Sequence, residues 1–257
     1  MADLKVISYN VNGIRAAIKK GLLDWVKDMN PDVLCLQELK ADDAAFDYAP
    51  FSDMGYHCHT FPAQKKGYSG VAILSKVKPD HVERGCGIKE YDDEGRNIRI
   101  DIGDISIMSV YIPSGTTGDE RQAVKMQYLV KFYDYIHQLT KERPKLLICG
   151  DYNICHKEID IHNPVSNKDT SGFKPEERAW MSQFFESGFV DTFRFFHPEP
   201  NQYSWWSLRA NSRANNKGWR IDYISATKNL EKDLTSSVMY QQAMHSDHCP
   251  VEVRVKR

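Results

Sequence analysis

The chain has 257 residues, of which 41% are hydrophobic and 27% charged; this is a globular composition and argues against a largely disordered or fibrous protein. Lysine and arginine total 34 against 35 aspartate and glutamate residues, so the formal net charge is -1. This balance gives no bulk indication of a nucleic-acid partner and excludes a strongly acidic, solvating surface. Taken alone, it favours an enzyme that acts on a small neutral metabolite.

No segment has the features of a membrane span or of a signal peptide. The longest apolar runs, such as 146–149, are far shorter than the ~20 residues that a membrane helix needs. The sequence opens directly on an alternating apolar stretch, without a basic and then apolar leader. Its six cysteines form no Cys-x-x-Cys pair, and most lie in apolar runs where a reduced thiol packs as a small hydrophobe. We therefore expect a cytoplasmic protein with no membrane partner.

Short apolar runs, many of them β-branched or alternating and bounded by turn residues, predict nine strands. In chain order they cover residues 4–9, 33–36, 56–61, 71–74, 98–102, 105–112, 146–149, 221–226 and 251–255. Apolar residues at helical spacing predict helices over 18–29, over 119–142 and from 175 onward. The first of these ends at Asn30-Pro31, because proline cannot continue it. No segment resembles a linker or a repeat, so we expect one domain over 1–257.

Polar side chains stand at the ends of several predicted strands. Asn10 and Glu38 follow the first two strands, and Asp151 follows the seventh. Asp222 opens the eighth, and Asp247 precedes the last. Each residue alone is more often a turn former than a ligand. If the strand ends converge, the four carboxylates repel one another unless a cation or protons join them. An all-oxygen set suits Mg²⁺ or Mn²⁺ better than zinc.

Eight motifs follow one another along nearly the whole chain. They are Asn10-Val11-Asn12-Gly13, Leu36-Gln37-Glu38, Gly67-Tyr68-Ser69-Gly70, Val110-Tyr111-Ile112-Pro113, Gly150-Asp151-Tyr152-Asn153, Glu158-Ile159-Asp160, Trp219-Arg220-Ile221-Asp222-Tyr223 and Ser246-Asp247-His248-Cys249-Pro250. In this order the motifs resemble the exonuclease III family of AP endonucleases, within the endonuclease, exonuclease and phosphatase superfamily. The resemblance implies a four-layer α/β sandwich, in which two mainly antiparallel sheets are flanked by helices.

The resemblance also implies a metal-dependent phosphodiesterase that uses Mg²⁺, for which Mn²⁺ can substitute. Glu38 resembles the principal metal ligand, with Asn10 beside it. Asp247 resembles a further or water-mediated ligand. Asp151 and Asn153 complete the set of residues expected at the metal. Such a site suits phosphoryl transfer, which depends on positioning and charge stabilisation more than on covalent chemistry.

Five residues acquire catalytic roles from the same resemblance. Asp151 matches the residue that either takes a proton from the attacking water or gives one to the leaving oxygen. Asn153 would orient the nucleophile, and Tyr111 would stabilise the charged phosphorus centre. Asp222 would hold His248, which would then contact the scissile phosphate as an imidazolium.

A basic and aromatic segment bears on the substrate. Residues 201–221 hold four basic residues and no acidic ones, a local charge of +4, together with four aromatic residues and four asparagines. These groups suit phosphate contacts beside a stacking surface. Without the resemblance, a solvated loop with core tryptophans is the preferred interpretation. With it, Trp205, Trp219 and Ile221 resemble the pocket for a flipped-out baseless sugar, which has no base to unstack. Further phosphate or sugar contacts are implied for Tyr68, Arg96, Asn163, Asn167, Asn211 and Arg213.

The predicted function is therefore cleavage 5′ to an abasic site in duplex DNA during base excision repair, leaving a 3′ hydroxyl. Some 3′ to 5′ exonuclease or 3′-end-cleaning activity is expected with it. The expected partner is duplex DNA with abasic sites or blocked 3′ ends, bound by a monomer that associates with the nucleoid if the source is prokaryotic. One alternative is another phosphoesterase of the superfamily, either a phosphatase or a less specific deoxyribonuclease. Another is a catalytically silent DNA-binding module, against which the complete set of motif carboxylates argues.

Overall fold

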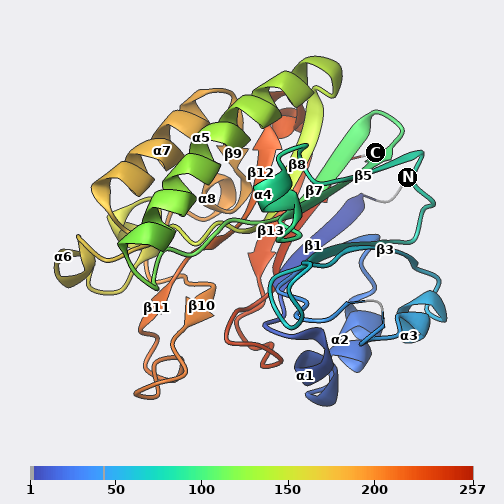
Figure 1. Ribbon diagram of the computed structural model, residues 1–257, viewed down its shortest axis with the longest axis horizontal. Coiled ribbons are helices and arrows are strands. Elements are labelled where there is room, and N and C mark those ends of the chain that lie inside the picture. The colour runs from blue at the N-terminus through green and yellow to red at the C-terminus, as the bar shows by residue number, and fades with distance from the viewer. Residues whose placement is uncertain (1–2, 43, 257) are drawn as a thin grey trace.

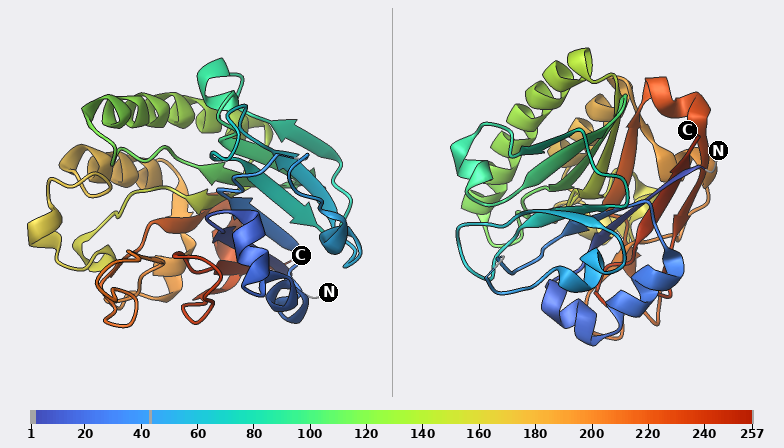
Figure 2. Two further views of the ribbon diagram at one scale, coloured as in Figure 1. Left: turned by 60° about the horizontal axis from the view of Figure 1, so that its bottom comes forward. Right: turned by 90° about the vertical axis from the view of Figure 1, so that its right-hand side faces the viewer.

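The computed structural model describes residues 3–42 and 44–256, and its elements form four layers (Figure 1). Two six-stranded sheets pack face to face in the middle. Helices α5 (Asp119–Glu142) and α7 (Pro175–Glu186) cover the outer face of one sheet. Helices α1 (Ile14–Lys19) and α2 (Leu22–Met29) lie against the other, as the two views of Figure 2 show. The predicted four-layer α/β sandwich is confirmed.

The two sheets have the same pattern of strand directions. The first has the order β13-β14-β1-β2-β4-β3, with β1 (Leu4–Asn10), β2 (Val33–Gln37), β3 (His57–Phe61), β4 (Val71–Ser75), β13 (Leu234–Met239) and β14 (Val251–Val255). The second has the order β5-β6-β7-β8-β12-β9, with β5 (His81–Arg84), β6 (Asn97–Ile102), β7 (Ile105–Tyr111), β8 (Lys145–Asp151), β9 (Phe189–Asp191) and β12 (Asp222–Thr227). Each sheet contains one parallel pair, β1 with β2 and β7 with β8, and its other pairs are antiparallel.

This arrangement brings the strand ends next to the predicted site residues to one end of the sandwich. The parallel strands β1, β2, β7 and β8 finish there, and the antiparallel strands β12 and β14 start there. In the second sheet, Tyr111, Asp151 and Asp222 lie side by side in register. In the first sheet, Asn10 lies beside Gln37, which directly precedes Glu38. The strand-end residues singled out in the sequence therefore converge.

All nine predicted strands are present, with ends that differ by no more than two residues. Three strands that were not predicted, β5, β9 and β13, are edge strands. Edge strands bury less and so carry a weaker apolar pattern. A short hairpin of β10 (Trp205–Trp206) and β11 (Gly218–Trp219) was also not predicted. Strands of two residues are too short to show an alternation of apolar and polar residues.

The helix predicted over 18–29 is in fact two helices. Gly21 has a φ of 92°, a left-handed conformation that glycine adopts without strain, and it separates α1 from α2. Helix α2 ends at Asn30, directly before Pro31, as predicted. Helix α5 has the predicted bounds, and α7 starts at the predicted Pro175. The remaining helices are α3 (Ala49–Ser52), α4 (Lys89–Asp92), α6 (Pro164–Asn167) and α8 (Thr192–Phe196), with 3₁₀ turns at Glu158–Asp160 and Lys228–Asp233.

Apolar side chains fill all three interfaces between the layers. The inner faces of the sheets meet through alternate strand residues, as in other sandwiches, including Val6, Val33, Ile100, Ile107 and Val253. Separate clusters join each sheet to its helices. None of the helices in the described residues is both long enough and apolar enough to cross a membrane.

Candidate active site

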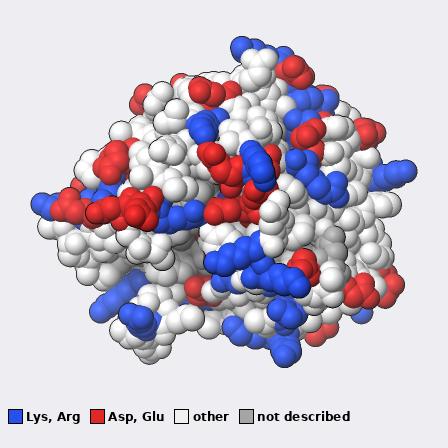
Figure 3. All heavy atoms as spheres, viewed as in Figure 1, with Lys and Arg blue, Asp and Glu red and all other residues white. Residues whose placement is uncertain are grey.

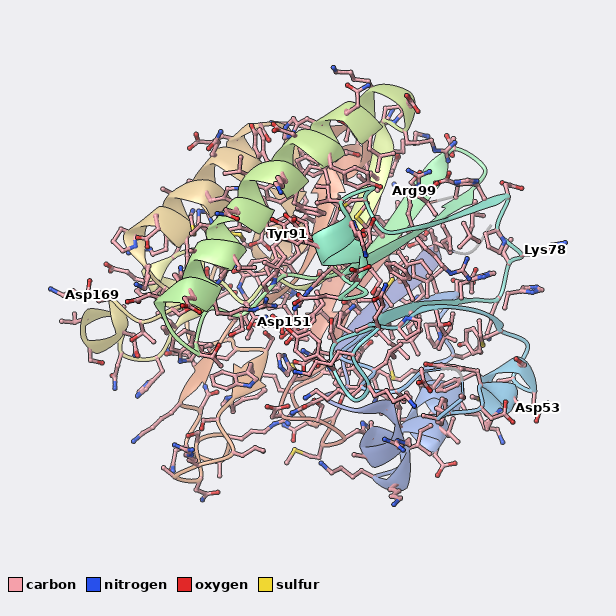
Figure 4. The ribbon with its side chains drawn as sticks, viewed as in Figure 1. Asp53, Lys78, Tyr91, Arg99, Asp151 and Asp169 are labelled. Atoms are coloured by element: carbon pink, nitrogen blue, oxygen red, sulfur yellow. The ribbon has the colours of Figure 1, made fainter. Side chains whose placement is uncertain are left out.

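A cavity of about 420 Å³ opens at the end of the sandwich where the strand ends converge. Nine of the predicted site residues line it: Glu38, Tyr111, Asp151, Asn153, Trp205, Trp219, Ile221, Asp247 and His248. Figure 4 shows Asp151 in the middle of this face of the molecule. Acidic and basic side chains gather next to each other over the same part of the face (Figure 3). The cavity thus combines charged and apolar walls.

The backbone at two strand ends is shaped to present the carboxylates. Glu38 has a φ of 51°, a left-handed conformation that side chains other than glycine rarely adopt. Its carbonyl accepts a 2.8 Å hydrogen bond from the Gly13 N–H, which holds this turn. At the end of β8, a Cβ on Gly150 would lie 1.9 Å from the Val110 carbonyl oxygen. Only glycine can therefore precede Asp151 without moving the neighbouring strand.

One amide side chain joins the carboxylates of the two sheets. Asn10 Nδ2 donates a 2.9 Å hydrogen bond to Glu38 Oε1 and another of 2.9 Å to Asp151 Oδ2. Its Oδ1 accepts from the Asn12 backbone N–H at 3.0 Å, which fixes the amide orientation because an N–H can only donate. The Asn10 oxygen is therefore engaged with the backbone. In this orientation Asn10 sets the spacing of the two carboxylates, and a second lone pair of its Oδ1 stays available, so metal binding by Asn10 stays a prediction.

His248 and Asp222 form the predicted pair. His248 Nδ1 lies 2.9 Å from Asp222 Oδ2, and both side chains are buried. Burial disfavours the charged imidazolium, but Asp222 outweighs it and raises the pKa of His248 to about 10. The other ring nitrogen, Nε2, lies 3.9 Å from Asp151 Oδ2 at the cavity wall. Nε2 can therefore donate a charged hydrogen bond to an anion in the cavity.

Ser204, which no sequence pattern marked, orients Asp222. Its hydroxyl donates a 2.7 Å hydrogen bond to Asp222 Oδ2 and accepts from the backbone N–H groups of Ile221 and Asp222, both at 3.0 Å. Serine next to a strand is too common to signal such a role. The pair of Asp222 and His248 is thus held from behind by a buried hydroxyl.

Asp151 is poised to exchange a proton. Burial, followed by the nearby charge of Asp222, raises the pKa of Asp151 to about 8. The Asn153 backbone N–H donates a 2.7 Å hydrogen bond to Asp151 Oδ1, and the Asn153 amide bonds to the Ile112 carbonyl oxygen at 2.9 Å. This carboxyl group therefore gains or loses its proton near neutral pH, as either of its predicted roles requires.

Tyr111 keeps its proton. Burial, together with the carboxylates of Glu38 and Asp151, raises the pKa of the Tyr111 phenol well above its usual range. Behind the ring lies the Arg96 guanidinium, whose carbon is 4.7 Å from the ring centroid. The phenol can therefore donate a hydrogen bond to an anion in the cavity.

Lys40 is a site residue that sequence reasoning missed. Its Nζ lies 2.8 Å from Glu38 Oε2, and it also donates to the Asn12 side-chain oxygen. Burial tends to raise the pKa of Glu38, but Lys40 and the Asn10 amide outweigh burial and lower it. The only available signal was the position of Lys40 two residues after Glu38. Glu38 is therefore ionised, as a metal ligand must be.

Asp247 is ionised as well, but its oxygens are engaged by neighbours. It accepts hydrogen bonds from Asn12 Nδ2 at 2.9 Å and from Trp205 Nε1 at 3.0 Å. Burial opposes the charge, yet His248 and these donors lower the pKa of Asp247. The tryptophan bond also links the acidic wall of the cavity to its apolar wall.

The donors at the centre of the cavity fit a divalent cation. Oxygen atoms of Glu38 and Asp151 and a ring nitrogen of His248 lie within 4.8 Å of one another. Because His248 Nδ1 is engaged by Asp222, the carboxylates of Glu38 and Asp151 are the candidate ligands. Carboxylate oxygens suit Mg²⁺ or Mn²⁺, which usually bind proteins through one or two carboxylates and keep several waters.

The apolar wall contains the three predicted pocket residues. The rings of Trp205 and Trp219 lie 6.0 Å apart between centroids and nearly perpendicular, at 88°. Ile221 packs beside them in a small cluster with Phe173 and Ile161. The structure thus brings an apolar surface next to the charged groups, and its use for a baseless sugar stays a prediction.

Arg96 is placed differently from the prediction. Its side chain is 1% exposed and donates to Glu94 Oε2, to the Tyr68 hydroxyl at 2.8 Å and to the Tyr111 carbonyl oxygen at 3.1 Å. The Tyr68 hydroxyl also accepts from Arg121 at 2.7 Å. A direct DNA contact by Arg96 does not fit this buried position. Arg96 instead packs against the Tyr111 ring on the side away from the cavity.

Two more basic residues of the 201–221 segment turn away from the surface. Arg213 donates to three backbone carbonyl oxygens and stacks on Trp206 at 4.5 Å, so its predicted DNA contact does not fit either. Arg220 is fully buried between Asp160 and Asp191. The local charge of +4 therefore overstates the surface charge, since only Arg209 and Lys217 are exposed.

Besides Tyr68, Arg96 and Arg213, three further predicted DNA contacts lie outside the cavity lining. Asn163 and Asn211 are exposed on the surface. Asn167 Nδ2 donates to the carbonyl oxygens of His162 and Asn163, within its own turn. Contacts of these three side chains with DNA stay predictions.

The chain matches the endonuclease/exonuclease/phosphatase family over residues 7–248. It belongs to this family. It is 41% identical over 252 residues to an exodeoxyribonuclease of Bacillus subtilis, with 97% of this chain and 98% of the relative covered. It is 39% identical over 259 residues to a DNA-(apurinic or apyrimidinic site) endonuclease of Dictyostelium discoideum, with 98% of this chain and 71% of the relative covered.

Among solved structures, an AP endonuclease from Archaeoglobus fulgidus superposes with a TM-score of 0.91 at 32% identity, covering 99% of this chain and all of that one. The resemblance drawn from the motifs is thereby confirmed. The names of these relatives also support the predicted enzyme class, a hydrolase of the nuclease type.

Proposed function

We propose that this family member is an AP endonuclease of DNA repair that uses Mg²⁺ to cleave the phosphodiester 5′ to an abasic site and leaves a 3′ hydroxyl. Some 3′ to 5′ exonuclease or 3′-end-cleaning activity accompanies it and uses the same catalytic groups. The observation that carries the proposal is the cavity itself, in which Glu38, Asp151 and protonated His248 face the apolar wall of Trp205 and Trp219. We also propose that the chain acts as one domain and as a monomer.

The charged wall supplies donors for a phosphate. His248 is an imidazolium whose Nε2–H faces the cavity, and Tyr111 is a neutral phenol beside it. Both can hydrogen-bond to the oxygens of a phosphate, where charge grows as the nucleophile attacks. Asp222 and Ser204 hold the imidazolium in position, so little reorganisation is needed during the reaction.

The acidic side of the cavity prepares the nucleophile. Asp151 exchanges a proton with the reacting oxygen, and Asn153 fixes the Asp151 carboxyl group through its backbone N–H. Glu38 and Asp151 would hold Mg²⁺, with Asn10 setting their spacing. When bound, Mg²⁺ would polarise the phosphate and offset the negative charge of the carboxylates. An adjacent site for a baseless sugar then selects the abasic nucleotide.

Incision of a duplex with one tetrahydrofuran abasic analogue tests the proposal. We expect a single nick 5′ to the analogue with Mg²⁺ and none with excess chelator. Glu38→Gln should raise the Mg²⁺ concentration needed for half-maximal rate and lower the rate by about 10²-fold or more, because the amide is a poorer ligand than the carboxylate. A duplex left intact by the wild-type protein with Mg²⁺ would remove the proposed function, and release of phosphate from inositol phosphates would indicate a phosphatase instead.

Trp219→Ala should separate lesion recognition from phosphodiester chemistry. We expect kcat/KM for the abasic duplex to fall about 10-fold or more, because the substitution removes apolar surface that the baseless sugar would bury, and such burial contributes about 25 cal/mol per Å². Hydrolysis of a small aryl phosphodiester should change by less than threefold. Phe195→Ala, which removes an exposed aromatic outside the cavity, is the matched control and should change neither rate. Equal losses with both substrates would argue against the sugar pocket.

A further inference from the structure

A buried ion pair lies one layer behind the cavity, between α5 and α7. Lys125 Nζ and Glu177 Oε1 are 2.5 Å apart, and both side chains are 0% exposed. Burying two charges costs about as much as their attraction returns, and an apolar pair of similar volume can join two helices equally well. Helix packing alone therefore gives no reason for a charged pair at this position.

Glu177 uses both carboxylate oxygens to hold a loop of the cavity wall. Oε2 accepts hydrogen bonds from the backbone N–H groups of Gly172 at 2.7 Å and Lys174 at 2.9 Å. Oε1 accepts from Gln122 Nε2 at 3.0 Å in addition to Lys125. The adjoining residues 170–172 line the cavity. The carboxylate thus fixes this wall to the two helices.

Besides its ion pair with Glu177, Lys125 makes a hydrogen bond to a residue on the catalytic side of the cavity. Its Nζ donates at 2.8 Å to the carbonyl oxygen of Asn153, the residue whose N–H holds Asp151. Asn153 has a left-handed φ of 52°. The Lys125 ammonium therefore braces the turn that follows β8 and that carries the bond to Asp151.

Gln122 and Gly172 complete the connections. Gln122 Oε1 accepts a hydrogen bond from the Ser171 hydroxyl at 2.7 Å. This is a second contact to residues 170–172 of the cavity wall, in addition to the bond between Glu177 and Gly172. A Cβ on Gly172, whose φ is 96°, would lie 3.0 Å from the Asn153 carbonyl oxygen and 3.0 Å from Trp219 Cζ3. A displacement of the backbone at Gly172 would therefore also displace Asn153 and Trp219, which lie against it.

We propose that Gln122, Lys125 and Glu177, here named the Lys125 cluster, are positioning residues that set the distance between the catalytic turn at Asn153 and the wall at Gly172 and Trp219. The inference rests on the proposed function, because its consequence is measured on the abasic duplex. The Lys125 cluster is buried and so cannot contact DNA itself. Its effect should therefore fall on kcat, with KM changing by less than threefold.

The decisive variant is the double substitution Lys125→Met with Glu177→Met. Methionines keep the apolar contact between α5 and α7, but the Gly172 and Lys174 N–H groups lose their acceptor, so the melting temperature should fall while the protein still folds. The bonds to Asn153 and Gly172 are lost, and we expect kcat for incision to fall about 10–100-fold, as misplacement of catalytic groups by about 1 Å can do. The small aryl phosphodiester should show the same loss in kcat, since Asp151 serves both substrates.

Two further variants keep the test free of folding effects. Leu139→Ala removes a buried side chain from α5, away from the cavity, and should lower the melting temperature while kcat stays within twofold. Ser171→Ala removes only the bond to Gln122 and should lower kcat two- to fivefold without loss of folding.

The outcomes are distinct. A stable double variant with wild-type kcat would overturn the positioning role while leaving the proposed function intact. A wild-type protein that fails to incise the duplex would remove the proposed function instead. If the double variant does not fold, Ser171→Ala decides: a lowered kcat supports the proposal, and an unchanged kcat contradicts it.

Discussion

Asp151→Asn is expected to reduce abasic-site incision by about 10³-fold or more while the fold is kept. The amide can no longer exchange a proton with the reacting oxygen, a contribution of about 10²–10⁴-fold, and it also weakens the hold on a cation. It presents an Nδ2 group next to the Asn10 amide, where the carboxylate accepted a hydrogen bond. Single-turnover incision with saturating Mg²⁺ measures the effect on chemistry apart from DNA binding.

The same substitution should leave the melting temperature at pH 7 unchanged or raise it. Burial and Asp222 raise the pKa of Asp151 in the folded state, so ionising this group opposes folding, and a neutral amide avoids that cost. Asp104→Asn, at an exposed carboxylate far from the cavity lining, is the matched control and should keep full activity. Activity of Asp151→Asn within tenfold of wild type would remove Asp151 from the catalytic assignment.

Asp160→Asn is expected to be the most destabilising of these changes, by about 3–5 kcal/mol. Asp160 is fully buried, and its Oδ1 accepts from Arg220 Nε at 2.8 Å and from Arg194 at 2.7 Å. The neutral amide leaves the buried Arg220 guanidinium with Asp191 as its one remaining carboxylate among the described residues. Urea unfolding measures the change, and Glu158→Gln on the same turn, which is exposed, should shift stability by less than about 0.5 kcal/mol.

The pH dependence of stability gives a second view of Asp160. Burial opposes its charge, but Arg220 and Arg194 outweigh burial and lower the pKa of Asp160 to about 2, from 3.8. A depressed pKa stabilises the folded state above pH 4, and this stabilisation, about 2 kcal/mol, is lost as the pH falls toward 2. We expect the unfolding free energy of wild type to fall more than that of Asp160→Asn between pH 4 and pH 2. Equal losses would contradict the assigned pairing.

The strands and the acidic site were predictable because they depend on local patterns. Alternating apolar residues predict the central strands. A carboxylate directly after a buried strand lies at the edge of the sheet, because the strand ends there. The predicted strand-end residues do converge, and Asn10 and Asp151 form a hydrogen bond although they are 141 positions apart. Because they belong to different sheets, the packing of the two sheets face to face brings them together.

The roles of the basic residues were not predictable in this way. Arg96 and Arg213 were predicted phosphate or sugar contacts, and Arg220 counted toward the basic 201–221 segment. All three are engaged by partners within the fold. A long cationic side chain can extend into solvent, or it can pair with a carbonyl or carboxylate group that is distant in the sequence. The sequence does not show which of these groups lies close to it. The roles of Ser204, Lys125 and Glu177 were not predictable either, because their partners are far from them in the sequence.

The sequence by itself determined the family and the central strands of both sheets, because apolar periodicity and motif spacing are properties of contiguous residues. Only the tertiary structure decided which charges are available to a substrate. A charge is neutralised or exposed according to the segments that meet around it, and those segments are brought together by packing of the two sheets and their helices. The near-neutral net charge is thus divided into buried ion pairs, such as Arg220 with Asp160 and Asp191, and a few charged groups at the cavity.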